Sequence, residues 1–459
     1  MKLDKYNFQI RIIFALIIFV IFNLIMHAFS IENASYTHGA DASRYYFSAL
    51  DIASGKGLGD LSYTGPLYPL FLSIHFLFFE ENNAFIALVA SQSTLLFLTG
   101  YIISILSRNL GFKVLQFIVI LFVIINPNSL MIAHLVQTET LFTFLLAAYF
   151  FFLHKYFTSQ HLRTLLIIAS LAVLISLTRP AGMYVMVFFS VFTLPILFKN
   201  KMPLKWFKHN SIYLLILAIG LSSISIYNHS VHGKYYISAN KGHVFHDQYV
   251  ALLQFGKNLP ASDALAQAKV VLNNNLSSEL RECEDNLTTL NCKDEVAAIY
   301  VKEIINENPL VIFRGFTSSI VSLLFTGGAS NFMNYFGLEA KEHIINFERS
   351  EGGIFQIDKI LEFLKAIDIK YLAVLIVFWG WAVCSKILMI VGILNELKKE
   401  NNLFFLSIFF ILGLFIAEYL FLGQSRWRAP LDPIFMLFAA VGFSYLLSKL
   451  KGKTNIPKP

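Results

Sequence analysis

Residues 11–29 read RIIFALIIFVIFNLIMHAF, an apolar run of 19 residues with no charged residue after Arg11. A membrane-spanning helix needs about 20 such residues. The run lacks a convincing cleavage site and is too long for the apolar core of a signal peptide. Because it follows Lys2, Lys5 and Arg11, it predicts a retained first span with a cytoplasmic N-terminus.

The composition shows that the whole chain, and not this run alone, is strongly apolar. Of its 459 residues, 56% are hydrophobic and 14% are charged. Soluble proteins carry about 25% charged residues. The composition therefore excludes a soluble enzyme, a disordered protein and a fibrous protein, and it predicts an all-α polytopic membrane protein.

Ten further apolar runs are bounded by polar residues: 66–79, 84–106, 113–126, 139–154, 162–178, 180–198, 210–227, 370–394, 402–422 and 430–448. The first of them, with 14 residues, is short for a span and favours a re-entrant or interfacial segment. A last apolar run, 309–325, is interrupted by Arg314 and is expected to form a helix on the membrane surface.

Charge predicts the orientation of the spans. The short loops between them are rich in Lys and Arg, which marks the cytoplasmic side. Residues 228–369 instead hold 12 Lys and Arg against 17 Asp and Glu, a net charge of −5 in a chain of net charge +7. Because the basic residues are spread over these loops, no nucleic-acid partner is expected.

Three regions follow from this pattern: an N-terminal transmembrane catalytic core (1–227) whose first outer loop is 30–65, a large outer-face domain (228–369), and C-terminal transmembrane helices with a basic cytoplasmic tail (370–459).

The three cysteines are expected to differ in role. Cys283 and Cys292 lie in the acidic region and are candidates for a disulfide if that region faces an oxidising compartment, the alternative being two free thiols. Cys384 lies inside an apolar run and is expected to be a buried small hydrophobe. No His or Cys cluster has the spacing of metal ligands, so no metal ligands and no cofactor are assigned, and a divalent metal stays an open alternative.

The segment from Gly39 to Gly55 has apolar residues at spacings of three and four, which predicts a short amphipathic helix. Asp41 would lie at its N-terminus, with Arg44 and Tyr45 on the same face. The aspartate can be an N-cap. It can also be a general base at the lipid–water boundary, where partial desolvation raises a carboxyl pKa.

Other charged residues lie at the outer ends of predicted spans. Glu139 begins a span, where its negative charge can interact favourably with the positive end of the helix dipole. Arg179, Arg426 and Arg428 flank other spans and can anchor them. Guanidinium groups also bind phosphate bidentately. Because these charged residues are predicted on one side of the membrane, they favour chemistry at the membrane surface over transport. Glu418, inside the apolar run 402–422, keeps a transporter as an alternative function.

Several motifs resemble those of one family and occur in the same order along the chain. They are the stretch from Asp41 to Gly55, Tyr63-Thr-Gly-Pro66-Leu-Tyr68-Pro69, Thr138-Glu139-Thr, Leu177-Thr-Arg179-Pro180-Ala-Gly182 and Arg426-Trp-Arg428-Ala-Pro430. They are similar to polytopic glycosyltransferases that use lipid-phosphate sugars, the GT-C relatives of protein O-mannosyltransferase and lipid A aminoarabinose transferase. Many of these have a glutamate after the aspartate, whereas this chain has Ala42.

The resemblance implies a GT-C bundle of about 10–12 transmembrane helices. It also implies transfer of a hexosyl or pentosyl group from a polyprenyl-phosphate donor to a lipid, glycan or protein acceptor, with inversion. The reaction would occur on the periplasmic or extracellular face of the cell inner (plasma) membrane, and Asp41 would match the catalytic aspartate.

Elementary chemistry agrees with these roles, because inversion at an anomeric carbon needs a base for the acceptor hydroxyl and positive charge for the departing phosphate. We expect Arg179, Arg426 and Arg428 to bind the phosphate. Four residues are expected to contact substrate: Arg44, Tyr45, Tyr68 and Glu139. The alternatives are a transporter or flippase of lipid-linked saccharides and an outer-face oligosaccharide polymerase or ligase.

Overall fold

The computed structural model describes residues 2–28, 42–58, 65–183, 203–233, 241–257, 263–271, 299–325, 327–336, 368–397 and 428–450, with the single positions 235, 237, 259 and 365. Every regular element in these ranges is a helix. Six of the described helices are long and apolar enough to cross a membrane, so the chain is an all-α polytopic membrane protein.

The six are α1 (Lys2–Ala28), α4 (Glu81–Asn109), α7 (Glu139–Ser159), α10 (Pro203–His232), α18 (Ile369–Leu397) and α21 (Asp432–Leu450). Each covers all or nearly all of a predicted apolar run, since apolar length alone identifies a span. The predicted run 402–422 and most of 180–198 lie outside the described residues, which leaves the total number of spans a prediction.

The predicted span 113–126 is shorter than expected and is followed by a bend. α5 (Gln116–Ile124) and α6 (Pro127–Ala133) meet at an angle of 58°. Proline cannot continue a helix but suits its first turn, so Pro127 ends one helix and begins the next. The side chain of Asn126 caps α6 by accepting a hydrogen bond from the Asn128 N–H at 3.1 Å.

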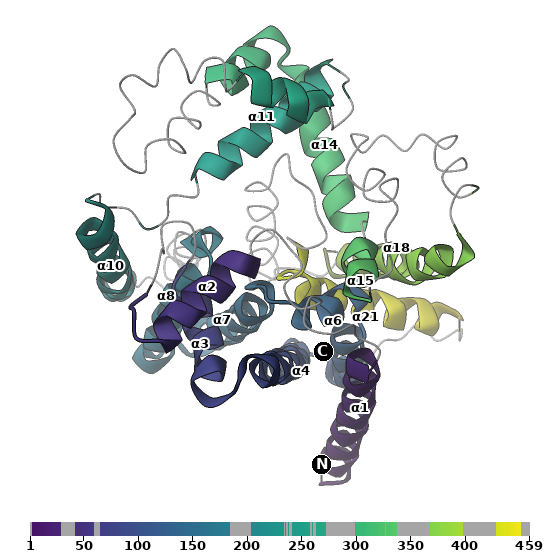
Figure 1. The fold of residues 1–459 in the computed structure, drawn as a ribbon. Helices are drawn as coiled ribbons and strands as arrows, with labels where there is room; N and C mark the ends of the chain where they lie inside the picture. The colour runs from purple at the N-terminus through teal and green to yellow at the C-terminus, as the bar shows by residue number, and fades with distance from the viewer. Residues whose placement is uncertain are drawn as a thin grey trace.

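Two short helices lie between α1 and α4: α2 (Ala42–Ala53) and α3 (Leu67–Phe78), which pack side by side (Figure 1). α2 is the predicted amphipathic helix, with Tyr45 and Ala49 buried and Phe47 exposed. α3 has 12 residues, or about 18 Å, and is too short to span a bilayer. It packs against α4 and against α8 (Leu162–Thr178).

Residues 241–257, 263–271 and 299–307, which fall in the predicted 228–369 domain, form a small helical group with its own core. α11 (Lys241–Lys257) packs with residues 263–271 and 299–307 around Tyr249 and Leu253. α14 (Leu310–Phe325) joins this group to the bundle and continues into α15 (Ala329–Tyr335), as Figure 1 shows. The expected surface position of α14 stays a prediction.

α18 and α21 run in the same direction, because Lys386 lies beside Asp432 and Gly392 beside Phe438. A returning span between them, at the predicted 402–422, would produce this arrangement. The expected burial of Cys384 is wrong, because its side chain is exposed on α18. A membrane helix is apolar on its lipid-facing side too, so an apolar neighbourhood does not predict burial.

Candidate active site

α7 and α8 form an antiparallel hairpin, which brings the start of one helix to the end of the other. Glu139 is the first residue of α7, and Arg179 follows the last residue of α8 in an extended conformation. The Nη1 atom of Arg179 lies 3.0 Å from Oε1 of Glu139, and the two side chains are 13% and 2% exposed. The hairpin therefore builds a nearly buried ion pair between two residues predicted for the site.

Both ends of this ion pair have further contacts. The hydroxyl of Thr138 donates to Oε2 of Glu139 at 3.3 Å. The guanidinium of Arg179 lies over the ring of Phe142, 5.8 Å from its centroid. These contacts fix the directions of both charged groups, which is a requirement for recognising a ligand with defined geometry.

Tyr68, at the start of α3, lies in the same region. Its ring meets the ring of Tyr45 edge to face, with centroids 5.1 Å apart. Its hydroxyl donates to Oε1 of Gln92 at 3.0 Å. Burial raises the pKa of Tyr68 well above its usual value, and the charge of Glu139 raises it further. The phenol is therefore a neutral donor.

A glycine holds the entry to α3 against the end of α8. A Cβ atom at Gly65 would overlap the backbone carbonyl of Leu177, two residues before Arg179. Only glycine permits this approach. The motif that precedes Tyr68 thereby fixes the distance between α3 and the ion pair.

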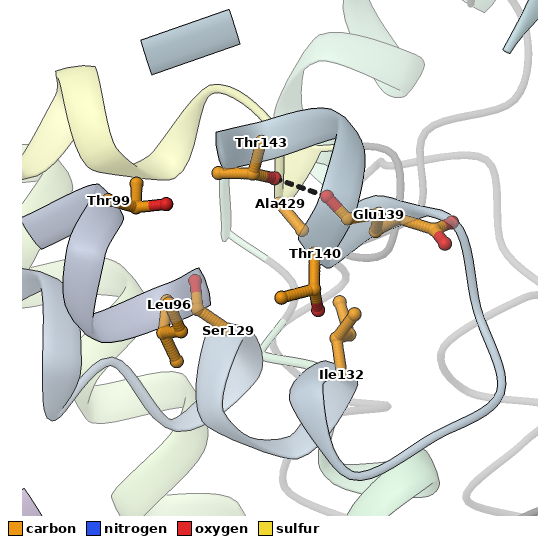
Figure 2. Close-up of a pocket in the computed structure, with 8 residues that line it drawn as sticks. All are labelled: Leu96, Thr99, Ser129, Ile132, Glu139, Thr140, Thr143 and Ala429. Atoms are coloured by element: carbon orange, nitrogen blue, oxygen red, sulfur yellow. Dashed lines mark hydrogen bonds between the residues drawn. The ribbon is translucent and has the colours of Figure 1, made fainter. Parts of the chain in front are cut away.

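A small pocket lies beside the ion pair, with room for about one water molecule. It is lined by Leu96, Thr99, Ser129, Ile132, Glu139, Thr140, Thr143 and Ala429. Figure 2 shows that the carboxylate of Glu139 is directed away from these side chains, while Thr143 donates to the Glu139 backbone carbonyl. The pocket joins α7 to α6 and to the turn before α21.

That turn carries a second cluster of charges. Oδ1 of Asp432 accepts from Nε of Arg428 and from Nζ of Lys386, both at 2.9 Å. Nη1 of Arg428 also donates to the carbonyls of Leu323 and Leu324 at the end of α14, at 2.7 and 2.8 Å. All three charged side chains are at most 3% exposed. With two cations and one anion, the cluster carries a net charge of +1.

Sequence reasoning missed Lys386 and Asp432. The available signal was a lysine in the middle of the apolar run 370–394, since ionisable residues inside spans usually face partners. The contacts of Arg428 give it a structural role, because it ties α14 to α21. Its expected role as a phosphate ligand stays a prediction.

The structure brings together four residues predicted for the site: Tyr45, Tyr68, Glu139 and Arg179. On α2, the side chain of Tyr45 is buried and that of Arg44 is exposed. Because Asp41 lies outside the described residues, the face that it is expected to share with Arg44 and Tyr45 stays a prediction. Five other predicted residues lie outside the described part of the chain: Asp41, Cys283, Cys292, Glu418 and Arg426.

Basic residues lie at the end of α7 away from Glu139 and at the start of α10. Lys155 lies in the last turns of α7, and Lys205 and Lys208 lie in the first turns of α10. Nζ of Lys205 donates to Oε1 of Gln160 at 3.0 Å. The ion pair of Glu139 is a full helix length away, about 30 Å for the 21 residues of α7.

Within the described ranges, no three His, Cys, Asp or Glu residues are grouped so that they could hold a metal ion. No family model matches the sequence, and no curated protein matches it.

Among solved structures, the chain is similar to the archaeal oligosaccharyltransferase AglB of Archaeoglobus fulgidus. The complex with an inhibitory peptide and a dolichol-phosphate has a TM-score of 0.49 and 13% identity, over 97% of this chain and 52% of that chain. The apo form has a TM-score of 0.49 and 15% identity, over 97% and 53%. This chain thus spans about half the length of those structures, and a similarity of this degree assigns neither a family nor an activity.

Proposed function

We propose that this protein is a membrane glycosyltransferase. It moves a sugar from a polyprenyl-phosphate donor to a lipid, glycan or protein acceptor, with inversion at the anomeric carbon. The observation that carries the proposal is the ion pair of Glu139 and Arg179, held beside Tyr68 at one end of the hairpin of α7 and α8. A fixed carboxylate suits sugar hydroxyls, and a fixed guanidinium suits a phosphate.

The face of the membrane follows from the charges at the helix ends. Basic residues favour the cytoplasmic side. Since Lys155, Lys205 and Lys208 lie at the ends of α7 and α10 away from Glu139, the site faces outward, toward the periplasm or the extracellular space. The membrane is the plasma membrane, which in a bacterium with two membranes is the inner one.

The chemistry needs one base and several cations. The acceptor oxygen attacks the anomeric carbon, and the bond from that carbon to the phosphate oxygen breaks with its electrons on the phosphate. Asp41, the residue before α2, takes the acceptor proton. A positioned base is worth about 10²–10⁴ in rate. Arg179 and Arg426 balance the charge that develops on the polyprenyl phosphate.

Arg428 acts through the cluster to which it belongs. Asp432 neutralises one of the two cations, so the cluster keeps a net charge of +1 near the pocket. Such a surplus charge in a medium of low dielectric constant attracts an anion over several ångströms. Arg44, Tyr45, Tyr68 and Glu139 then position the sugar and the acceptor.

The test begins with cells that lack the protein and compares their glycolipids with those of wild-type cells. Loss of one sugar from a surface product, with accumulation of its lipid-phosphate donor, is the expected result. Complementation with Asp41→Asn should leave the defect, whereas Asp51→Asn should restore the product. Asp51 is a matched control because it is a second aspartate ten positions further along the chain, on α2, in an exposed pair with Lys56.

Detergent-solubilised protein separates the transferase from a transporter. A transferase still moves radiolabelled sugar from the donor fraction to the acceptor fraction when no membrane divides them, and a flippase does not. If Asp41→Asn transfers sugar as well as the wild type does, the assignment of Asp41 as the base is rejected. Absence of any transfer by the wild-type protein, with donor present, would reject the proposed activity.

A further inference from the structure

Gln92 of α4 is a fully buried amide with three hydrogen bonds. Its Nε2 donates to the carbonyl of Ala133 at 3.0 Å and to that of Leu135 at 2.8 Å. Its Oε1 accepts from the hydroxyl of Tyr68 at 3.0 Å. Two acceptors on one side and one donor on the other leave a single orientation of the amide, so its assignment is unambiguous.

These three contacts tie together α3, α4 and the turn that leads into α7. Within that turn, the Gln137 N–H donates to the Leu135 carbonyl at 2.9 Å. Glu139 begins α7 two residues later. Gln92 therefore joins α3, α4 and the turn 133–138 at the point where the chain places its carboxylate.

We propose that Gln92 is the positioning residue of the candidate active site. It holds the turn 133–138 and the Tyr68 hydroxyl in one fixed arrangement, and through them it sets the direction of Glu139 toward Arg179. Gln92 touches no substrate in this role. The part of the proposal that concerns sugar transfer rests on the proposed function, whereas the part that concerns the turn does not.

An amide is required because the site needs two donors and one acceptor from one side chain. Methionine has a similar volume and supplies neither N–H group. Glutamate keeps the acceptor for Tyr68, but its ionised form turns a carboxylate oxygen toward the Ala133 and Leu135 carbonyls. When a buried glutamate is protonated it regains one O–H donor, and burial raises the pH at which this happens.

The first experiment measures hydrogen exchange of a peptide covering residues 133–138 in purified protein, expressed as protection factors. Gln92→Met should lower protection about tenfold at pH values of about 6 and 8, since all three hydrogen bonds of Gln92, two of them to the turn, are lost. Gln92→Glu should lower it at the higher pH and regain part of it at the lower pH. The variant with methionine keeps the test valid if the glutamate variant does not fold.

Gln116→Met and Gln116→Glu are matched controls. Gln116 is also a buried glutamine, but its Nε2 faces the Ser104 carbonyl in another part of the bundle. These variants should leave the protection of 133–138 unchanged. Equal loss of protection in the Gln116 variants, or full protection in Gln92→Met, would overturn the proposal.

The second experiment measures sugar transfer in membrane vesicles. Gln92→Glu should show transfer that rises toward acidic pH, whereas the wild type and Gln116→Glu should not. A flat pH profile with altered protection would overturn the link from the turn to the reaction. Loss of the proposed function is distinguished from this, because then the wild type transfers no sugar while the exchange experiment still reports on Gln92.

Discussion

Asp432→Asn should destabilise the protein far more than its small change in shape suggests. Asn has nearly the same volume as Asp and keeps a side-chain oxygen that can accept hydrogen bonds from Lys386 and Arg428. What changes is the charge. The cluster goes from a net charge of +1 to +2, with both cations at most 3% exposed.

The magnitude follows from this change in charge. Removing one partner from a buried ion pair costs about 3–5 kcal/mol, because it leaves an uncompensated charge out of water. Lys386→Met has the opposite effect on charge, since it brings the cluster to zero and keeps the pair of Arg428 and Asp432. The methionine would lie against Phe435, whose ring centroid is 4.6 Å from Nζ of Lys386.

Replacement of a buried charge by an apolar group of similar volume is often neutral or stabilising. We therefore expect Lys386→Met to change the free energy of unfolding by less than about 1 kcal/mol. In the double variant Asp432→Asn with Lys386→Met, a single cation remains, and part of the loss caused by Asp432→Asn should be recovered.

The assay is thermal unfolding of the purified protein in lipid nanodiscs at neutral pH, followed by intrinsic fluorescence. Lys56→Met is the control, because Lys56 and Asp51 form a pair at 3.5 Å whose side chains are 70% and 41% exposed. Exposed pairs contribute little, so its midpoint should match the wild type. The reasoning is refuted if Asp432→Asn unfolds within about 0.5 kcal/mol of the wild type, or if Lys386→Met is equally damaging.

Two further predictions use the same unfolding assay. A Cβ atom at Gly392 would overlap the Phe438 carbonyl, so Gly392→Ala should lower the free energy of unfolding by about 1–3 kcal/mol. Gly380→Ala is the control, because no atom lies within 4 Å of the added Cβ, and it should be neutral or slightly stabilising. Equal effects of the two variants would argue against the contact between α18 and α21. Burial, and then the charge of His27, lower the pKa of His134 from 6.5 to about 4, so the unfolded chain binds a proton that the folded protein does not. Stability should fall as the pH drops from 6.5 toward 4, by on the order of 3 kcal/mol, and His134→Gln should flatten that dependence.

The sequence predicts the spans well because a membrane-spanning helix is identified by the length and apolar composition of its segment alone. It predicts burial within a span poorly, as Cys384 shows, because lipid and protein interior are equally apolar. The bend at Asn126 was also missed. Pro127 was visible in the sequence, but the run before it looked continuous, and only the structure shows that a helix resumes after it.

The site was predicted in part. Charge patterns placed Glu139 and Arg179 on the same side of the membrane, and the hairpin of α7 and α8 brings them into contact. Their separation of 40 positions in the sequence carries no information about that distance. The pairing of Lys386 with Asp432 is equally a property of packing, because it depends on two helices that run in parallel with a predicted span between them.

α6 connects the two charged clusters. At its start, the Asn126 side chain accepts from the Asn128 N–H at 3.1 Å, and α6 packs against α18, the helix that carries Lys386. At its end, the Ala133 carbonyl accepts from Gln92, and His134 contacts Asn23 of α1 at 2.9 Å and Tyr335 of α15 at 3.2 Å.

A helix of seven residues has little stability of its own, so these polar contacts decide where it lies. Its residues Ser129 and Ile132 line the pocket together with Glu139 and Ala429. A change of charge at Asp432 therefore acts, through its pair with Lys386 on α18, on a short helix whose last residue leads into the turn before Glu139. For this reason the loss caused by Asp432→Asn should appear at the Glu139 site, as lower hydrogen-exchange protection of residues 133–138, and not only in the unfolding midpoint.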